Sequence, residues 1–199
     1  MWDQRYGEPG YAYGTSPNDF LAANVTAFPP GRLLCLAEGE GRNAVFLAGQ
    51  GFDVHAIDQS TVGMAKAAQL AQQMGVQLRT QVADLAQTAL QPSHWQGIVS
   101  IFAHVPPALR RALHAQVVDA LAPGGVFLLE AYTVRQLDTD GVGGPGPQQR
   151  DFFMSLEQLE DELRGLELLH GLELEREVNE GRFHRGRGAV VQVIARKPA

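Results

Sequence analysis

The hydrophobic positions of the chain gather in short apolar runs that alternate with amphipathic stretches. The run at 33–37 is apolar without alternation, which is typical of a strand covered on both faces. Residues 76–82 alternate instead, which predicts a strand nearer a sheet edge. Similar runs predict strands at 54–58, 97–102, 126–131, 167–177 and 189–195. Amphipathic stretches predict helices at about 16–28, 44–48, 60–74, 107–121 and 155–163.

Capping signals set the expected starts of these helices. Ser16 is expected to cap the first helix, with Pro17 at its first helical position. Ser60 is expected to cap the helix at 60–74, and the apolar face of that helix is expected to carry Met64, Ala67, Ala68 and Ala71.

A glycine loop follows the run at 33–37. Gly39 and Gly41 allow a tight turn before the helix at 44–48, and strand, glycine loop and helix form the first half of a nucleotide-type binding site. The next strand ends at Asp58, which follows Gly39 by 19 positions. This is close to the offset of about 20 residues at which a carboxylate binds a ribose hydroxyl. The alternative is an ordinary turn with a solvated Asp58.

The charges of the loop indicate which nucleotide it binds. Glu38 and Glu40 flank Gly39 and would oppose a pyrophosphate at a helix N-terminus, although Arg42 could serve a phosphate. Two acids favour a cofactor with cationic groups. S-adenosylmethionine fits because it has a ribose and an adenine, a sulfonium and an ammonium, and no phosphate.

This stretch resembles motif I of the class I S-adenosylmethionine-dependent methyltransferases, in particular the small tellurite-resistance and thiopurine methyltransferase-like members. The resemblance covers most of residues 1 to about 135, and Glu40 departs from it because such enzymes more often have a small residue there. It rests also on the stretches 2–6, 13–18, 57–60, 83–85 and 121–125. It implies a doubly wound α/β fold, Rossmann-like, with a seven-stranded mixed sheet, the last strand antiparallel and helices on both faces.

The resemblance also implies roles for residues of the site. Gly39 and Gly41 would cradle the cofactor, Glu38 would face its amino group and Asp58 its ribose. Asp84 would bind the adenine amino group between Ala83 and Leu85, unless it only caps a turn. The other expected cofactor contacts are Tyr13, Glu40, Asn43, Gln59, Ser60 and Phe102.

His104 follows the predicted central strand at 97–102, where α/β sheets place their chemistry. It is the candidate general base, since the pKa of histidine lies near neutrality. The alternative is a histidine that orients the loop or the cofactor. Methyl transfer from a sulfonium is an in-line displacement, and proximity and orientation alone can suffice for it.

Two further segments are expected to border the site. Residues 1–15 are rich in aromatic residues without regular structure; they are expected either to fold over the cofactor, where aromatic faces attract a sulfonium, or to pack on the core. The Gly- and Pro-rich loop at 137–149 is either a lid over the acceptor or merely a mobile loop. Tyr132 could line the acceptor pocket. His184 either reaches the pocket or lies in solvent, and solvent is the preferred interpretation.

Length, composition and charge limit the number of domains, the kinds of partner and the expected location of the protein. The 199 residues predict a single methyltransferase domain, with a cap segment and helix at 1–30 and a core at 31–199. The net charge of −6 and the lack of a basic run disfavour nucleic acid as a partner. No apolar run or leader pattern indicates a membrane or secretion, so a cytoplasmic location is expected. Cys35 is expected to be a buried apolar residue, Arg110 and Arg111 a solvated face, and the six histidines show no metal-ligand spacing.

The sequence therefore predicts a methyltransferase that uses S-adenosylmethionine on a small-molecule acceptor. A non-catalytic cofactor-binding or regulatory protein, a nicotinamide-dependent oxidoreductase, and a methyltransferase acting on protein or RNA are the alternatives. A cavity closed by residues 1–15 and 137–149 would favour a small acceptor, and an open cleft a macromolecule. The acceptor and the oligomeric state stay open.

Overall fold

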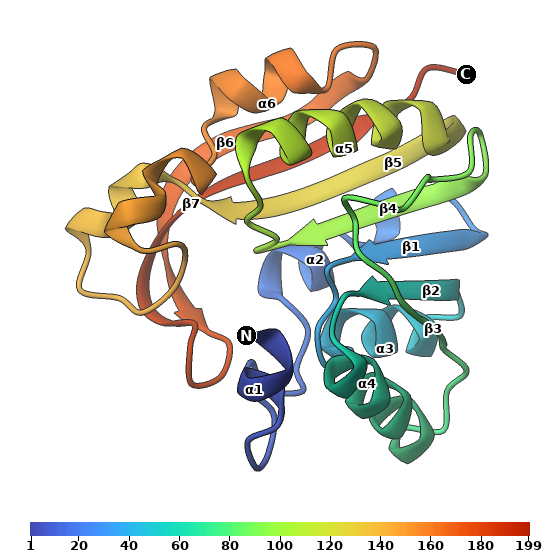
Figure 1. The fold of residues 1–199 in the computed structure, drawn as a ribbon. Coiled ribbons are helices and arrows are strands. Elements are labelled where there is room, and N and C mark those ends of the chain that lie inside the picture. Colours follow the sequence, from blue (N-terminus) through green and yellow to red (C-terminus); the bar gives the residue numbers. More distant parts are fainter.

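The computed structural model describes residues 1–199 as a doubly wound α/β fold (Figure 1). Its sheet has seven strands in the order β3-β2-β1-β4-β5-β7-β6, and β7 runs antiparallel to the other six. The predicted fold class is thus confirmed. The strands are β1 (Arg32–Leu36), β2 (Asp53–Asp58), β3 (Arg79–Val82), β4 (Trp95–Ile101), β5 (Leu121–Tyr132), β6 (Glu167–Asn179) and β7 (Arg185–Arg196).

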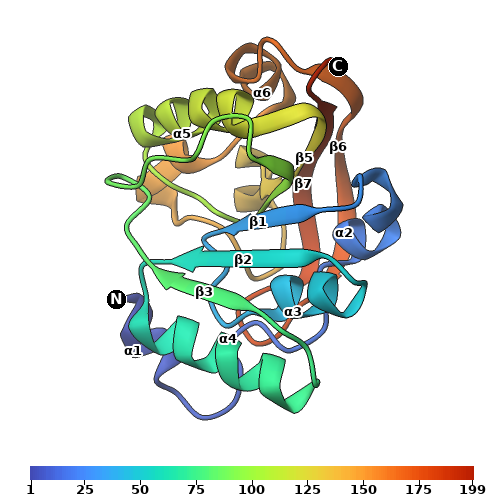
Figure 2. The ribbon, with the colours of Figure 1, turned by 90° about the vertical axis from the view of Figure 1, so that its right-hand side faces the viewer.

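Helices cover both faces of this sheet (Figures 1 and 2). The α-helices are α1 (Trp2–Tyr6), α2 (Asp19–Ala23), α3 (Arg42–Gly49), α4 (Thr61–Gln73), α5 (Pro107–Ala120) and α6 (Leu156–Glu162). Short 3₁₀ helices are η1 (Val25–Ala27), η2 (Val134–Asp138) and η3 (Pro147–Phe152). None of the helices combines the length and the apolar character that crossing a membrane requires.

The unbroken apolar run of β1 follows from burial on both faces. Leu34 and Leu36 pack with α5 and α6, whereas Leu33 and Cys35 pack with α2, α3 and α4. Successive side chains of a strand point to opposite faces, so a strand between two helical layers needs apolar residues throughout. Cys35 is fully buried, as expected.

Several local predictions need correction. Asn18 caps α2 in place of Ser16, because its Oδ1 accepts a hydrogen bond from the backbone N–H of Leu21 at 2.9 Å. Residues 2–6 form a helix where no regular structure was expected. On α4 the exposed Ala68 lies off the buried face, which includes Leu70 instead. The β3 strand begins only at Arg79 but does form a sheet edge.

Arg110 is also corrected from a solvated residue to a buried one. It is 2% exposed, and its guanidinium donates to both carboxylate oxygens of Glu162 on α6 at 2.9–3.1 Å. Glu162 also contacts Nδ1 of His114 at 2.7 Å. Arg110 further donates to the carbonyl of Phe153 at 3.2 Å, so this cluster holds α6 and the preceding segment on α5.

A second buried ionic cluster joins the β6–β7 hairpin to the parallel part of the sheet. Arg176 of β6 donates to both oxygens of Glu130 on β5 at 2.7 Å and to Glu180 at 2.8 Å. Asn18 donates to both of these carboxylates, and Arg42 at the start of α3 pairs with Glu180. Glu130 is completely buried and Glu180 nearly so.

We expect Arg176→Met to lower the free energy of unfolding by about 3–5 kcal/mol, because it leaves two buried carboxylates without their shared cation. The matched control is Arg196→Met on β7, whose pair with Glu167 is about half exposed and contributes about 1 kcal/mol or less. Urea unfolding measures both variants. Equal losses would contradict the importance assigned to the buried cluster.

Candidate functional site

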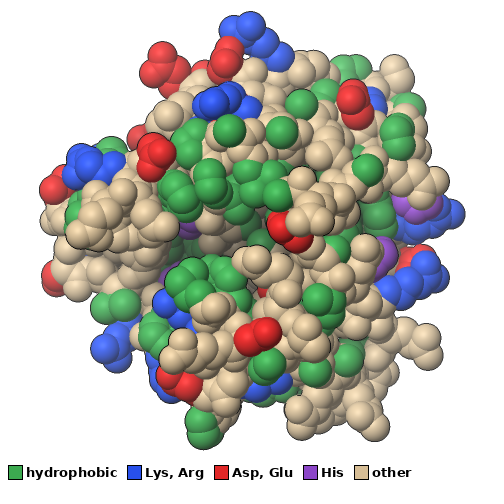
Figure 3. All heavy atoms as spheres, in the orientation of Figure 1, with side chains coloured by type: hydrophobic (Ala, Val, Ile, Leu, Met, Phe, Trp, Pro, Cys, Tyr) green, Lys and Arg blue, Asp and Glu red, His purple; other side chains and the backbone are tan.

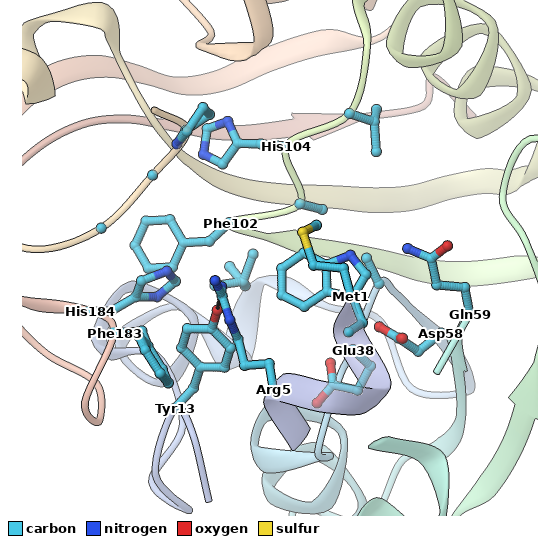
Figure 4. Close-up of a pocket in the computed structure, with 18 of the residues that line it drawn as sticks. Met1, Arg5, Tyr13, Glu38, Asp58, Gln59, Phe102, His104, Phe183 and His184 are labelled. Atoms are coloured by element: carbon cyan, nitrogen blue, oxygen red, sulfur yellow. Dashed lines mark hydrogen bonds between the residues drawn. The ribbon is translucent and has the colours of Figure 1, made fainter. Parts of the chain in front are cut away.

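A cavity of about 650 Å³ opens at the carboxyl ends of the central strands (Figure 4). In the space-filling view it is a recess bordered by hydrophobic side chains (Figure 3). Of the expected site residues, it brings together Tyr13, Glu38, Glu40, Asn43, Asp58, Gln59, Ala83, Asp84, Leu85, Phe102 and His104. Gly39, Gly41 and Ser60 are not among its lining residues.

The two glycines of the loop serve packing. Both have left-handed backbone, with φ of +65° at Gly39 and +92° at Gly41. A Cβ on Gly39 would come within 2.7 Å of the hydroxyl of Tyr6, and one on Gly41 within 2.6 Å of Cβ of Ala67. The front segment and α4 therefore require glycine here, and the expected role of both glycines as a cradle for the cofactor stays a prediction.

Glu38 stands at the start of α3. Its Oε1 accepts from the backbone N–H groups of Asn43 at 2.9 Å and Ala44 at 2.8 Å. These are donors that a helix N-terminus cannot satisfy internally. Burial nevertheless raises the pKa of Glu38 to about 7. The side chain lines the cavity, so it is a carboxyl group whose charge responds to a cationic ligand.

Asp58 ends β2 and joins the two loops at the cavity. Oδ2 accepts from the N–H of Gly39 at 2.9 Å and Oδ1 from the N–H of Ser60 at 2.8 Å. Burial raises the pKa of this carboxyl above its usual value. Ser60 itself caps α4 through Gly63 and donates its hydroxyl hydrogen to Asp3, which explains why it does not face the cavity.

Glu40 and Asn43 border the cavity, but their polar atoms bind the front of the chain. One oxygen of Glu40 pairs with Lys66 at 2.9 Å and the other accepts from the N–H of Ala12 at 2.7 Å. Oδ1 of Asn43 accepts from the N–H of Asn18 at 2.9 Å. The acid that departs from the family pattern therefore fastens residues 1–15, and its expected contact with the cofactor stays a prediction.

Ala83, Asp84 and Leu85 line the cavity at the end of β3. Oδ1 of Asp84 accepts from the N–H of Ala86 at 2.9 Å, so this exposed residue does cap its own turn. A carboxylate oxygen has a second lone pair, and capping leaves the side chain able to accept from a ligand amine as well.

The opposite end of the cavity is aromatic. Phe102 follows β4 with a left-handed φ of +52°, and its ring stacks on Tyr132 at 4.5 Å. Tyr132 lies behind Phe102 and does not line the cavity, contrary to expectation. His184 lines it instead of facing solvent, with its ring 4.6 Å from that of Phe102. Its Nδ1 is buried without a partner, and burial lowers its pKa well below the usual value.

His104 is held by the backbone on both sides. Its Nδ1 contacts the carbonyl of Phe152 at 3.0 Å, and its Nε2 accepts from the N–H of Tyr132 at 3.1 Å. Burial lowers the pKa of His104 to about 4. Neither ring nitrogen is free to take a proton from an acceptor, so this arrangement speaks against the predicted general base and favours the orienting alternative.

Two segments far apart in sequence wall the cavity. The front segment contributes Met1, Trp2, Arg5, Tyr6, Tyr13 and Gly14. The loop expected as a lid contributes residues 142–146 and 149. Sequence reasoning missed Arg5 and Phe183, and it preferred solvent for His184. Arg5 lies within the stretch 2–6 that carries the family resemblance, whereas nothing local marks the two hairpin residues.

Residues 33–125 match the family model described as a methyltransferase domain. No curated protein matches the chain in sequence. The fold is similar to that of TehB from Haemophilus influenzae, with a TM-score of 0.72 and 20% identity over 90% of this chain and 61% of TehB. A methyltransferase from Methanosarcina mazei gives a TM-score of 0.70 and 18% identity over 92% of this chain and 99% of that one.

A third similar structure is phosphoethanolamine N-methyltransferase 2 from Haemonchus contortus in complex with S-adenosylmethionine. It gives a TM-score of 0.70 and 19% identity over 100% of this chain and 60% of that one. Residues 33–125 thus match a methyltransferase domain, and the chain has the fold of known S-adenosylmethionine-dependent methyltransferases.

Proposed function

We propose that the chain transfers the methyl group of S-adenosylmethionine to a small-molecule acceptor. The observation that carries this proposal is that the front segment, residues 142–146 and residue 149 form walls of the cavity. A volume of about 650 Å³ lies within the range of small-ligand sites and has to hold cofactor and acceptor together. An extended macromolecule needs an open cleft instead.

The cofactor would lie along the acidic side of the cavity. Glu38 receives the ammonium of the methionine tail, Asp58 the ribose hydroxyls, and Asp84 the adenine amino group. Ala83, Leu85 and Gln59 complete the adenosine end. This assignment is supported by the presence of all six side chains on one cavity, and by the backbone hydrogen bonds that fix Glu38 and Asp58.

The acceptor would lie at the aromatic end, near Phe102 and His184. Bound S-adenosylmethionine supplies an electrophilic methyl group on a sulfonium. The chain contributes proximity, orientation and exclusion of water, which can lower a barrier by about 7–11 kcal/mol in well-oriented reactions. His104 shapes this end by fixing the carbonyl of Phe152, while Phe152 and the loop at 142–146 form the outer wall.

The direct test is the formation of S-adenosylhomocysteine with panels of acceptors. We expect turnover with members of a panel of small thiols, phenols, amines and oxyanions, and none with unfolded polypeptide or RNA. Deleting residues 143–146 shortens the loop and widens the cavity at this wall. The deletion should leave the affinity for the cofactor unchanged and weaken the discrimination among small acceptors. Methylation of polypeptide or RNA alone would overturn the small-molecule assignment.

The pH dependence of cofactor binding tests Glu38. Burial raises the pKa of Glu38 to about 7, and only its ionised form pairs with an ammonium. Affinity for S-adenosylhomocysteine should therefore rise roughly five- to ten-fold from pH 6 to 7.5, in proportion to the ionised fraction.

Calorimetry of Glu38→Gln should show weaker binding without this rise. The neighbouring Glu40→Gln is the control and should keep it, since the oxygens of Glu40 bind Lys66 and Ala12. The same pH slope in wild type and Glu38→Gln would refute the role of Glu38.

His104 should behave as a positioning residue. His104→Asn should lower the free energy of unfolding by about 1–3 kcal/mol at pH 7, because two backbone groups lose their partner. Burial lowers the pKa of His104 to about 4, so the unfolded chain binds a proton below about pH 6.5 that the folded chain does not.

The stability that His104 provides is therefore fully present above pH 6.5 and is lost as the pH falls toward 4. The difference between wild type and His104→Asn should shrink over this range in urea titrations. In addition, kcat of the wild type should show no histidine inflection between pH 5.5 and 8. If a stably folded His104→Asn variant lost kcat by several orders of magnitude, His104 would be the general base after all.

A further inference from the structure

Arg5 is a cation of the cavity wall without a counter-charge in the chain. Only two arginines line the cavity, and the other, Arg42, pairs with Glu180. Arg5 makes no ion pair; its Nη1 donates to the neutral hydroxyl of Tyr13 at 2.8 Å. Since a guanidinium has five N–H donors, most of the binding capacity of Arg5 is unused.

The side chain is nevertheless held in place. Its guanidinium carbon lies 5.1 Å from the ring centre of Trp2 and 4.8 Å from that of Phe183. Asp3 of the same helix accepts from the hydroxyl of Ser60 and the N–H of Val62 at the start of α4. Aromatic rings and a helix tied to α4 thus hold the guanidinium of Arg5 in one orientation. This pre-organisation favours ligand binding, because the side chain loses little conformational entropy when the ligand binds.

The surroundings of Arg5 indicate the charge of that ligand. Glu38 lines the same cavity from the loop after β1 (Figure 4). An α-amino acid has an ammonium and a carboxylate on one carbon atom, and a cavity lined by the carboxyl group of Glu38 and by the unpaired guanidinium of Arg5 offers a partner for each. Arginine binds carboxylates in bidentate geometry, and Tyr13 can donate its own hydroxyl hydrogen to the same group.

We propose that Arg5 binds the carboxylate of the amino-acid tail of S-adenosylmethionine, with Tyr13 beside it. This inference rests on the proposed function, which gives the ammonium to Glu38. The front segment would then recognise the amino-acid tail of the cofactor through Arg5 and Tyr13. An anionic acceptor would present similar chemistry to Arg5, and the experiment separates the two sources.

The test compares two ligands that differ only in the carboxylate. S-adenosylhomocysteine has the complete tail, and its decarboxylated analogue S-adenosyl-3-thiopropylamine keeps the ammonium alone. Calorimetry gives the dissociation constants of both for wild type, Arg5→Met, Arg5→Lys and Arg182→Met. Arg182 is the matched control, because it also lies over the ring of Phe183 but is exposed, pairs with Glu8 and does not line the cavity.

We expect Arg5→Met to weaken S-adenosylhomocysteine about 10- to 100-fold, as for a lost charge-assisted hydrogen bond, and the decarboxylated analogue by about two-fold or less. Arg5→Lys should fall between wild type and Arg5→Met, and Arg182→Met should match wild type.

Equal weakening of both ligands by Arg5→Met would show a merely structural role and overturn the inference. Unchanged affinity for both ligands, with a raised acceptor KM, would assign Arg5 to the acceptor and also overturn it. If wild type binds neither ligand, the proposed function fails first. Thermal unfolding of Arg5→Met and Arg5→Lys confirms that both fold.

Discussion

The buried cluster of Arg176, Glu130 and Glu180 fixes the relative positions of segments that are far apart in sequence. It joins the hairpin to β5, and Asn18 and Arg42 extend it to the front segment and to α3. Tyr13 and the hairpin residues Phe183 and His184 meet at the cavity because of it; the rings of Tyr13 and His184 lie 4.5 Å apart. Loss of one partner would leave a buried charge uncompensated. The segments that carry the charges are therefore held in one relative arrangement.

The cavity has two chemically different ends. Carboxylates that accept from backbone N–H groups line one end, and these groups fix their positions without neutralising them. Aromatic rings and neutral histidines line the other, with burial lowering the pKa of both His104 and His184. Under the proposed function, this division suits a polar cofactor at one end and a methyl transfer, in which the sulfonium loses its charge, at the other. A cavity end of low polarity helps to exclude water from such a reaction.

The sequence was sufficient for features that depend on neighbouring residues. The apolar run of β1, the glycine loop, Asp58 at the end of β2 and the cap at Ser60 are all recognised within a few positions, and the structure has each of them. Residues whose partners are distant were misjudged. Glu40 binds Ala12, Arg110 binds Glu162 across 52 positions, and His184 packs on Phe102. No local pattern distinguishes a solvated arginine from one that meets a carboxylate on a later helix.

Ala37 and Phe102 both have left-handed backbone, with φ of +49° and +52°, at the ends of the adjacent strands β1 and β4. Such a conformation costs a residue with a side chain about 1–3 kcal/mol. The fold thus gives up stability at two residues that follow central strands and line the cavity. An engineer who relaxes these two positions to obtain a more heat-resistant protein would be working against the shape of the site, whereas the distal surface offers stabilisation without that conflict.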